Sequence, residues 1–383
     1  MRQFGDKSHS PGFSPRRMIS IFKNQVSYDK VPREVCRKNC NQSLERTSED
    51  PMKVIVTDFI ESNLAWEQDL FQQQGIDFYP FQLKYASEEE LAAAGSDADV
   101  VIVNMAPISE QVIAGWTRCS LVIRHGIGYD NVDVEALSRR GIPLVNIPDY
   151  CVEEVAEQTI ALILSLGRKV AFSRMILEAS VQRGSWDFSD IYPIHRMRGQ
   201  TLGIIGCGRI GSRVYEKLKE FGFKFAFCDP YLSNTRKNAM GIRTEPLDEV
   251  LVRSDFITLH TPLNSETEML INEKTLRLMK PSAYLINTAR AGLIDQNALV
   301  CALKEGRIAG AALDVFIPEP PLPEEELLGM ENVILTPHLS WCSVESEQTI
   351  REKIVDQVLR FRDGHSLDNI VNWEALKLLE APR

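Results

Sequence analysis

The chain has 383 residues, of which 44% are hydrophobic and 25% charged, so it is long enough for two domains with substantial cores. A formal net charge of −10 argues against direct nucleic-acid contact and against binding to an anionic membrane surface. No apolar stretch approaches the roughly 18 residues that a membrane span needs, and no secretory signal is evident, which predicts a cytoplasmic protein. The eight cysteines include no C-x-x-C pair, so reduced thiols and no metal site are expected.

Residues 1–51 differ from the rest of the chain. They hold ten Lys or Arg and six Asp or Glu, and they show little apolar periodicity. A transit peptide is one interpretation, but the six acidic residues argue against it. A disordered extension, or a start codon placed too early, is expected instead, with the first domain beginning at Met52.

Residues 52–150 alternate between strand-like and helix-like patterns. Short apolar runs predict five strands, at 53–57, 76–79, 100–104, 121–124 and 144–146. Helical patterns lie among them, at 63–74, 88–94 and 133–140. This alternation predicts a flavodoxin-like open parallel sheet.

A long helical run at 152–170 leads out of this first sheet. A second helical run follows at 171–182, and 184–199 is expected to be a surface loop. The apolar stripe of the first run is broader than one sheet face needs, which favours a homodimer joined through the second domain.

Residues 200–229 carry the most specific pattern in the chain. An apolar run at 201–205 stops at Gly206-x-Gly208-x-x-Gly211, a helical pattern follows, and a second apolar run ends on Asp229. Strand, glycine-rich turn, helix, strand and acid in this order are typical of a dinucleotide-binding βαβ unit. The helix N-terminus would receive the pyrophosphate. Because the Asp229 carboxylate can accept hydrogen bonds from a ribose diol and repels a 2′-phosphate, NAD is the expected cofactor.

Four further strands are predicted after this unit, at 256–259, 284–287, 309–315 and 333–335. A helix at about 344–361 comes after the second sheet is complete, so we expect it to return to the first domain. The fold class is therefore α/β, with two doubly wound parallel-sheet domains and a cleft between them. A substrate domain is expected at 52–150 and 335–372, a Rossmann domain at 151–334, and a tail at 373–383.

Three polar residues follow predicted strands of the second sheet: Arg290, Glu319 and His338. Loops beyond the carboxyl ends of parallel strands line the ligand crevice of such sheets. An arginine can grip a carboxylate or polarise a carbonyl. A histidine can donate a proton to a developing alkoxide, and a glutamate can hold the imidazole in place and keep it protonated. Taken singly, each residue could be an ordinary surface charge or capping group, but together they indicate chemistry on a 2-keto acid.

The sequence resembles the D-isomer-specific 2-hydroxyacid dehydrogenases. The matching stretches are 124–131, 201–211, 259–263, 285–295, 306–320 and 336–341. Within that family it most resembles the C-terminal-binding proteins and their bacterial relatives, through 203–211, 228–233 and Trp341. The family also forms dimers through its cofactor domains, which agrees with the homodimer expected above.

The resemblance implies roles for the matched positions. Arg290 would bind the substrate carboxylate and carbonyl, His338 would be the acid/base, and Glu319 would be its partner. Backbone N–H groups of Gly126 and Ile127 would hold the substrate carboxylate. His125 and Trp341 would shape the substrate pocket. The residues implied for the cofactor are Gly206, Gly208, Arg209, Ile210, Gly211, Asp229, Thr261, Thr288 and Asp314, the last of them near the nicotinamide amide.

Two functions remain open from the sequence. One is an enzyme that interconverts a 2-keto acid and its D-2-hydroxy acid with NAD(H). The other is an NAD(H)-sensing corepressor or binding module like the C-terminal-binding proteins, which keep the same Arg, Glu and His residues. Nothing in the sequence singles out formate or phosphite, the substrates of other family members.

Overall fold

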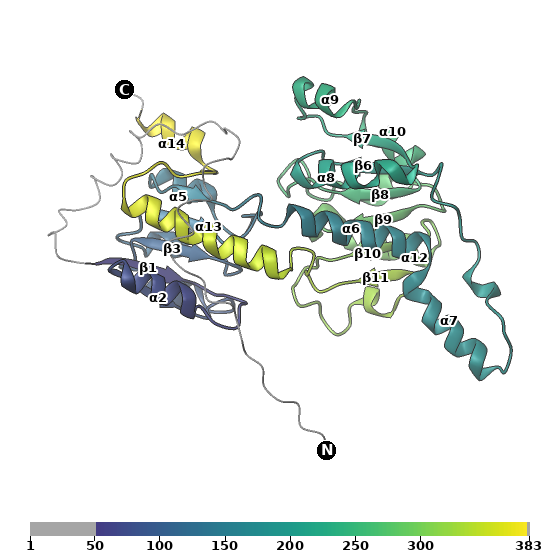
Figure 1. Ribbon diagram of the computed structural model, residues 1–383, viewed down its shortest axis with the longest axis horizontal. Helices are drawn as coiled ribbons and strands as arrows, with labels where there is room; N and C mark the ends of the chain where they lie inside the picture. The colour runs from purple at the N-terminus through teal and green to yellow at the C-terminus, as the bar shows by residue number, and fades with distance from the viewer. Residues whose placement is uncertain (1–50, 381–383) are drawn as a thin grey trace, which may run out of the picture.

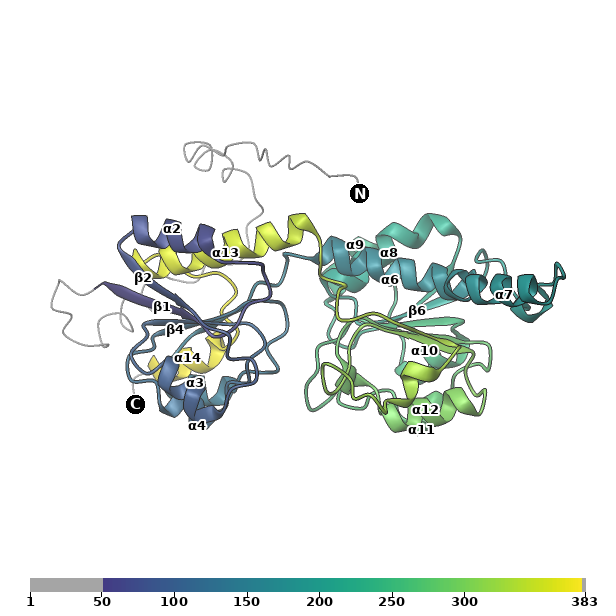
Figure 2. The same cartoon turned by 90° about the horizontal axis from the view of Figure 1, so that it is seen from below.

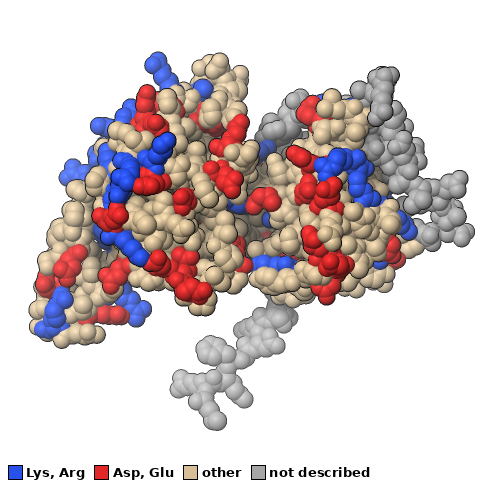
Figure 3. Space-filling model, turned by 180° about the vertical axis from the view of Figure 1, so that it is seen from behind, with Lys and Arg blue, Asp and Glu red and all other residues tan. Residues whose placement is uncertain are grey.

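The computed structural model describes residues 51–380, and the interpretation of residues 1–50 lies outside this part of the chain. The described chain forms two lobes, each built on a parallel β-sheet (Figure 1). Figure 3 shows a notch between the lobes, with basic and acidic side chains interspersed on the face in view. The predicted fold class, two doubly wound parallel sheets, is confirmed.

The first lobe contains a five-stranded sheet in the order β2-β1-β3-β4-β5. Every pairing in it is parallel, with Val54 of β1 opposite both Phe78 and Val100. This is the flavodoxin-like order that the sequence predicts. The strands are β1 (Met52–Val56), β2 (Ile76–Pro80), β3 (Val100–Val103), β4 (Leu121–Arg124) and β5 (Leu144–Val145).

Helices cover both faces of the first sheet, and Figure 2 shows α2 and α13 together on one of them. Phe71 of α2 and Ile354 of α13 share a buried cluster with the strands on that face. Trp116 anchors the cluster on the opposite face, where α3, α4 and α5 pack. The helices of this lobe are α2 (Ala65–Gln73), α3 (Glu88–Ala94), α4 (Glu110–Ala114), α5 (Val134–Arg139), α13 (Val344–Arg362) and α14 (Trp373–Glu380).

The second lobe contains a six-stranded parallel sheet in the order β11-β10-β9-β8-β6-β7. The strand order reverses between β6 and β8, and in open α/β sheets the crevice at such a switch point receives ligands. The strands are β6 (Thr201–Ile205), β7 (Lys224–Cys228), β8 (Phe256–Leu259), β9 (Tyr284–Asn287), β10 (Gly310–Leu313) and β11 (Val333–Leu335).

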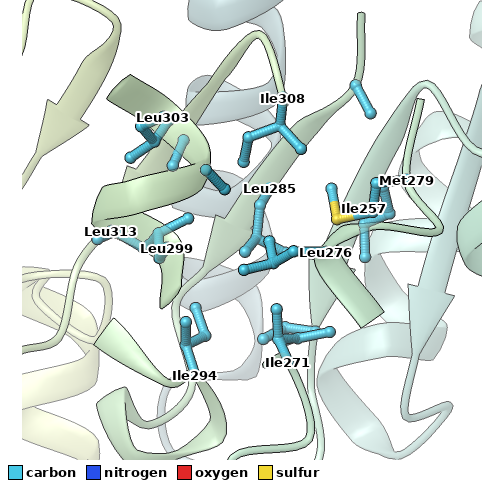
Figure 4. Packing of buried hydrophobic residues seen from close by; sticks show 14 of the residues in the cluster. Ile257, Ile271, Leu276, Met279, Leu285, Ile294, Leu299, Leu303, Ile308 and Leu313 are labelled. Carbon is cyan, nitrogen blue, oxygen red and sulfur yellow. The ribbon is translucent and has the colours of Figure 1, made fainter. Parts of the chain in front are cut away.

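Two apolar layers enclose the second sheet. On one side Leu285 packs among Ile257, Leu276 and Leu299 (Figure 4). On the other side α6 and α8 share a cluster with β6 and β8. The helices of this lobe are α6 (Val152–Gly167), α7 (Val170–Gln182), α8 (Arg209–Leu218), α9 (Asn234–Met240), α10 (Leu247–Arg253), α11 (Glu273–Leu276) and α12 (Gln296–Lys304).

The chain passes between the lobes twice, from β5 into α6 and from β11 into α13. Arg351 of α13 forms a bidentate ion pair with Glu67 of α2, with N···O distances of 2.5 and 2.7 Å. Asn372, after α13, also bonds to the backbone of Leu144 and Ile142. We therefore propose the domain division given by the sequence, with substrate-domain segments at 52–150 and 335–372.

Several elements differ from the sequence-based expectation. The segment expected as a tail after residue 372 begins with helix α14, whose Leu376 is buried. The two helical runs predicted at 152–170 and 171–182 are present, but α6 ends at Gly167 and Lys169, with a left-handed φ of 56°, separates it from α7. The short helices α4, α9, α10, α11 and α12 were not expected, because four to nine residues give little periodicity to detect.

The apolar stripe of α6 is used inside the protein. Its buried residues, Leu162, Ile163 and Leu166 among them, pack within the second lobe. Exposed apolar residues lie instead on α7, which projects from this lobe at the lower right of Figure 1. These stripe residues are therefore not available as a dimer surface, and the homodimer itself stays a prediction. No helix in the described part of the chain is both long and apolar enough to cross a membrane.

Candidate active site

The carboxyl ends of the two sheets meet at one place. Arg290 follows β9 of the second lobe, and Asp130 lies in the loop that follows β4 of the first lobe. Arg290 Nε donates a hydrogen bond of 2.8 Å to Asp130 Oδ1. The loops after β10 and β11, which carry Glu319 and His338, belong to the same sheet edge as Arg290.

His338 and Glu319 are brought together although 19 residues separate them in sequence. His338 Nδ1 lies 2.8 Å from Glu319 Oε2 and 3.1 Å from Oε1. The backbone N–H of Phe316 also donates to Glu319, at 3.1 Å. Partial burial of the Glu319 carboxyl favours its neutral form. The hydrogen bond and charge of His338 outweigh this burial, so the pKa of Glu319 is lowered. Glu319 is therefore a carboxylate at neutral pH.

A strained backbone holds His338 in this position. Its φ is 53°, in the left-handed region that non-glycine residues seldom adopt. The fully buried carboxylate of Asp314 accepts hydrogen bonds from the N–H groups of Leu339 and Ser340, at 3.0 and 2.9 Å, and from the hydroxyl of Thr336. Such strain persists only where surrounding contacts determine the conformation. Asp314 thus organises the histidine loop, and its proposed contact with the cofactor amide stays a prediction.

Two guanidinium groups give the site a positive field. Arg124, at the end of β4, bonds to Asn131 through Nε at 3.2 Å and to the carbonyl of His125 through Nη1. Burial, helped by the charge of Arg290, lowers the pKa of Arg124 to about 10, so it remains charged at neutral pH. Asp130 is partly buried, which favours its neutral form, but the charge and hydrogen bond of Arg290 lower its pKa overall.

The predicted substrate loop lies beside these arginines. Asn146 Nδ2 donates to the carbonyl of Ile127 at 2.7 Å, which ties the loop to β5. The N–H of Gly126 donates to the carbonyl of Arg124 at 2.9 Å. In this conformation the Gly126 N–H already donates to the Arg124 carbonyl. Binding of a substrate carboxylate by this N–H stays a prediction, and it would require the bond to Arg124 to break.

His125 lies against Glu61 of the first lobe, and its role in shaping a substrate pocket stays a prediction. Its Nε2 lies 3.2 Å from Glu61 Oε1, and His125 lines a small pocket together with Glu67 and Arg351. Burial, and then the charge of Arg124, lower the pKa of His125 to about 3. The imidazole is therefore neutral at physiological pH, with Nε2 facing the Glu61 carboxyl. Trp341 is partly buried and its carbonyl accepts from Ser346 Oγ, so its place in a substrate pocket stays a prediction.

The glycine-rich turn has the shape that a dinucleotide requires. A Cβ at Gly208 would meet no atom within 4 Å, so open space lies beside this position at the start of α8. Gly206 has a φ of 91°, and a Cβ there would lie 2.6 Å from the backbone of His260. A Cβ at Gly211 would lie 2.0 Å from the carbonyl oxygen of Gly206, so only glycine lets helix and strand approach this closely. The residues present therefore fit a bound dinucleotide.

Asp229 lies beside this turn, at the end of β7. Its two carboxylate oxygens accept the N–H groups of Cys207, at 2.8 Å, and Tyr231, at 3.0 Å. The remaining implied cofactor residues lie at the start of α8 or follow strands of the same sheet, and their contact with a cofactor stays a prediction. Arg209 and Ile210 open α8, Thr261 follows β8, and Thr288 follows β9 with its hydroxyl 2.9 Å from that of Thr159.

Sequence reasoning missed Asp130, Arg124 and Glu61. Arg124 and Asp130 lie beside and within the loop at 125–131 that follows the fourth predicted strand. Their charges in that loop could have marked them as site residues. Glu61 carried no signal, because its partner His125 lies 64 residues further along the chain and the sequence does not show that the two meet.

Comparison with known proteins agrees with this geometry. Residues 160–340 match the family model described as the D-isomer specific 2-hydroxyacid dehydrogenase, NAD binding domain. A D-3-phosphoglycerate dehydrogenase from Methanocaldococcus jannaschii is 39% identical over 75% of this chain and 54% of the relative. A glyoxylate reductase from Korarchaeum cryptofilum is 37% identical over 71% of this chain and 82% of the relative. The chain thus spans about half the length of the former and most of the latter.

Solved structures of dehydrogenases are also similar to this chain. A D-lactate dehydrogenase from Aquifex aeolicus, in complex with NAD and lactic acid, aligns with a TM-score of 0.71 and 30% identity. The alignment covers 86% of this chain and all of that one. Similar structures have been determined with NAD and with NADPH.

A dinucleotide-binding turn on the same sheet edge as an arginine and a paired histidine and glutamate is typical of a nicotinamide-dependent oxidoreductase. The chain belongs to the D-isomer-specific 2-hydroxyacid dehydrogenase family. It is therefore an NAD-dependent 2-hydroxyacid dehydrogenase.

Proposed function

We propose that the protein reduces a 2-keto acid to its D-2-hydroxy acid, with His338 as the proton donor. The observation that carries this proposal is the 2.8 Å contact between His338 Nδ1 and Glu319 Oε2, on the sheet edge that also carries Arg290. With Nδ1 engaged by Glu319, the other ring nitrogen, Nε2, is left to give its proton to the substrate oxygen. Bound NADH would supply the hydride.

The other residues bind and orient the substrate in this proposal. The Arg290 guanidinium would hold the carboxylate and polarise the carbonyl, and the loop at Gly126 and Ile127 would face the same carboxylate. Glyoxylate is a sensible first substrate to test, because one relative is named a glyoxylate reductase. Trp341 after the histidine favours a larger or apolar side chain on the natural substrate. We infer a cytoplasmic location, which the free thiols of the described cysteines support.

The second candidate is an NAD(H)-sensing binding module of the kind formed by the C-terminal-binding proteins. The sequence at 228–233 and Trp341 favour it, and it would use the same cofactor turn. The two functions differ in turnover, because a sensor needs to bind NADH but does not need to consume it.

A panel of 2-keto acids with NADH separates the two functions. We expect brisk NADH oxidation with at least one compound, and we expect His338→Ala to lower kcat by roughly 10²- to 10⁴-fold, the usual contribution of a general acid. NADH affinity, measured by fluorescence, should stay unchanged because the cofactor turn is intact. Trace activity on every compound, insensitive to His338→Ala, would favour the sensor.

Glu319→Gln tests the pairing through pH dependence. The pKa of Glu319 is lowered from its ordinary value of 4.5, so above that pH the wild-type carboxylate supports the charged imidazolium. Keto-acid reduction consumes the donated proton, so we expect kcat/KM to fall toward high pH. The glutamine removes the supporting charge but keeps the shape, and the fall should move to lower pH. Superimposable kcat/KM profiles would leave Glu319 as an ordinary loop carboxylate.

Asp229→Ala tests the preference for NAD(H). A 2′-phosphate beside the Asp229 carboxylate would be a close like-charge contact, which costs several kcal/mol. The variant should therefore improve kcat/KM with NADPH relative to NADH. Asp229→Asn removes the charge but keeps a carbonyl acceptor, so it should also improve NADPH use and thereby separates the effect of the charge from that of the lost hydrogen bonds. Equal use of both cofactors by the wild type would show that Asp229 does not face the ribose.

We also propose a homodimer joined through the cofactor domains. The exposed apolar residues on and after α7, Val181 and Trp186 among them, are 69% and 81% exposed in the single chain. A paired Val181→Asp, Trp186→Asp variant should halve the mass seen by light scattering at micromolar concentration. Leu378→Asp on α14, an exposed leucine of the other lobe, should leave that mass unchanged. A monomeric wild type would refute the dimer.

A further inference from the structure

The Arg290 guanidinium is held by the loop after β4 of the opposite lobe. Nε donates to Asp130 Oδ1 at 2.8 Å, and Nη1 donates to the carbonyl of Ala289 at 2.8 Å. A guanidinium has five N–H donors in a fixed plane, so two anchored donors set the direction of the other three. Asp130 supplies the anchor that comes from the first lobe.

Gly128 supplies the room for this guanidinium. A Cβ at Gly128 would lie 1.6 Å from Arg290 Nη2 and 2.5 Å from Cζ. The backbone at Gly128 does not itself require glycine, since its φ lies outside the left-handed region, unlike the φ of 150° at Gly126. The absence of a side chain at Gly128 thus serves the close approach of Arg290.

Asp130 and Gly128 stand on the same loop as Gly126 and Ile127, the expected substrate-carboxylate site. The loop therefore meets Arg290 at two points, a hydrogen bond to Nε and a backbone surface against Nη2. The Asp130 carboxylate is ionised at neutral pH, because Arg290 lowers its pKa despite partial burial. It also offsets the repulsion between Arg290 and the nearby charge of Arg124.

We propose that Asp130 and Gly128 are positioning residues for the reaction: together they fix the Arg290 guanidinium so that Nη2 faces the substrate loop. The proposal rests on the proposed role of Arg290 in holding the 2-keto acid. A guanidinium that is held in the correct position before the reaction interacts fully with the substrate in the transition state. A displaced guanidinium loses much of that interaction. The geometry of Arg290 then depends on both lobes, because its backbone belongs to one and its anchor to the other.

Gly128→Ala is the sharpest test, because the added methyl group meets the flexible end of a side chain and no backbone. We expect kcat/KM for glyoxylate to fall roughly 10- to 100-fold, as for an active group displaced by about 1 Å. Asp130→Ala should give a loss of similar size, and Asp130→Asn, which keeps an acceptor for Nε, a smaller one. NADH affinity and the melting temperature should stay near the wild-type values.

Two controls match these changes. Gly329→Ala adds a methyl group at a glycine with no atom within 4 Å of the new Cβ and no left-handed φ. Glu110→Ala removes the carboxylate of a surface pair with Arg139, away from the site. Both should keep wild-type kcat/KM.

A double-mutant cycle tells positioning from a merely structural role. In an Arg290→Lys background, which keeps the charge but loses the planar fork, Gly128→Ala should change kcat/KM by less than about 2-fold. An equal loss in both backgrounds, or no loss in the wild-type background, would overturn the proposal. If wild type reduces glyoxylate and needs His338 but tolerates Arg290→Ala, the positioning proposal fails while the dehydrogenase function stands. If wild type reduces no 2-keto acid, the proposed function itself fails.

Discussion

The direction of the strands determines where chemistry can occur in this protein. All strands of a parallel sheet end at the same edge, so the loops that carry polar side chains gather there. The protein has two such sheets, and the ion pair between Arg290 and Asp130 shows that these edges meet. Neither lobe holds the whole set of candidate residues, because the substrate loop comes from one and the histidine, glutamate and arginine from the other. The site therefore exists only where the two lobes are in contact.

Within the second lobe, one buried carboxylate keeps the histidine loop in a conformation that it would otherwise avoid. Asp314 accepts two backbone N–H groups and a hydroxyl from the residues around His338. These bonds stabilise the left-handed backbone that presents the imidazole to Glu319. The same acid was expected near the cofactor from family resemblance. A residue that organises a loop so tightly can affect catalysis without touching the substrate.

Local patterns and strand direction made much of the molecule predictable from the sequence. The glycine-rich turn and Asp229 lie within 30 residues and follow a fixed spacing, so their arrangement is a local property. Glu319 and His338 could be expected to meet because both follow strands of one parallel sheet. The contact of Asp130 with Arg290 depends on how two lobes pack, and the inward direction of His125 depends on a partner 64 residues away. Helix α14 was missed because eight residues near the end of the chain give a weak pattern.

The return of α13 to the first lobe has a consequence for synthesis on the ribosome. All five strands of that lobe are made before residue 146, but the apolar face of the sheet is covered by Ile350, Ile354 and Val358, which emerge some 200 residues later. The second lobe is continuous in sequence and can complete its own core in the interval. Until α13 has been synthesised, one face of the amino-terminal sheet therefore remains incompletely covered. A nascent chain stalled before α13 would be a substrate for chaperones that bind exposed apolar surface.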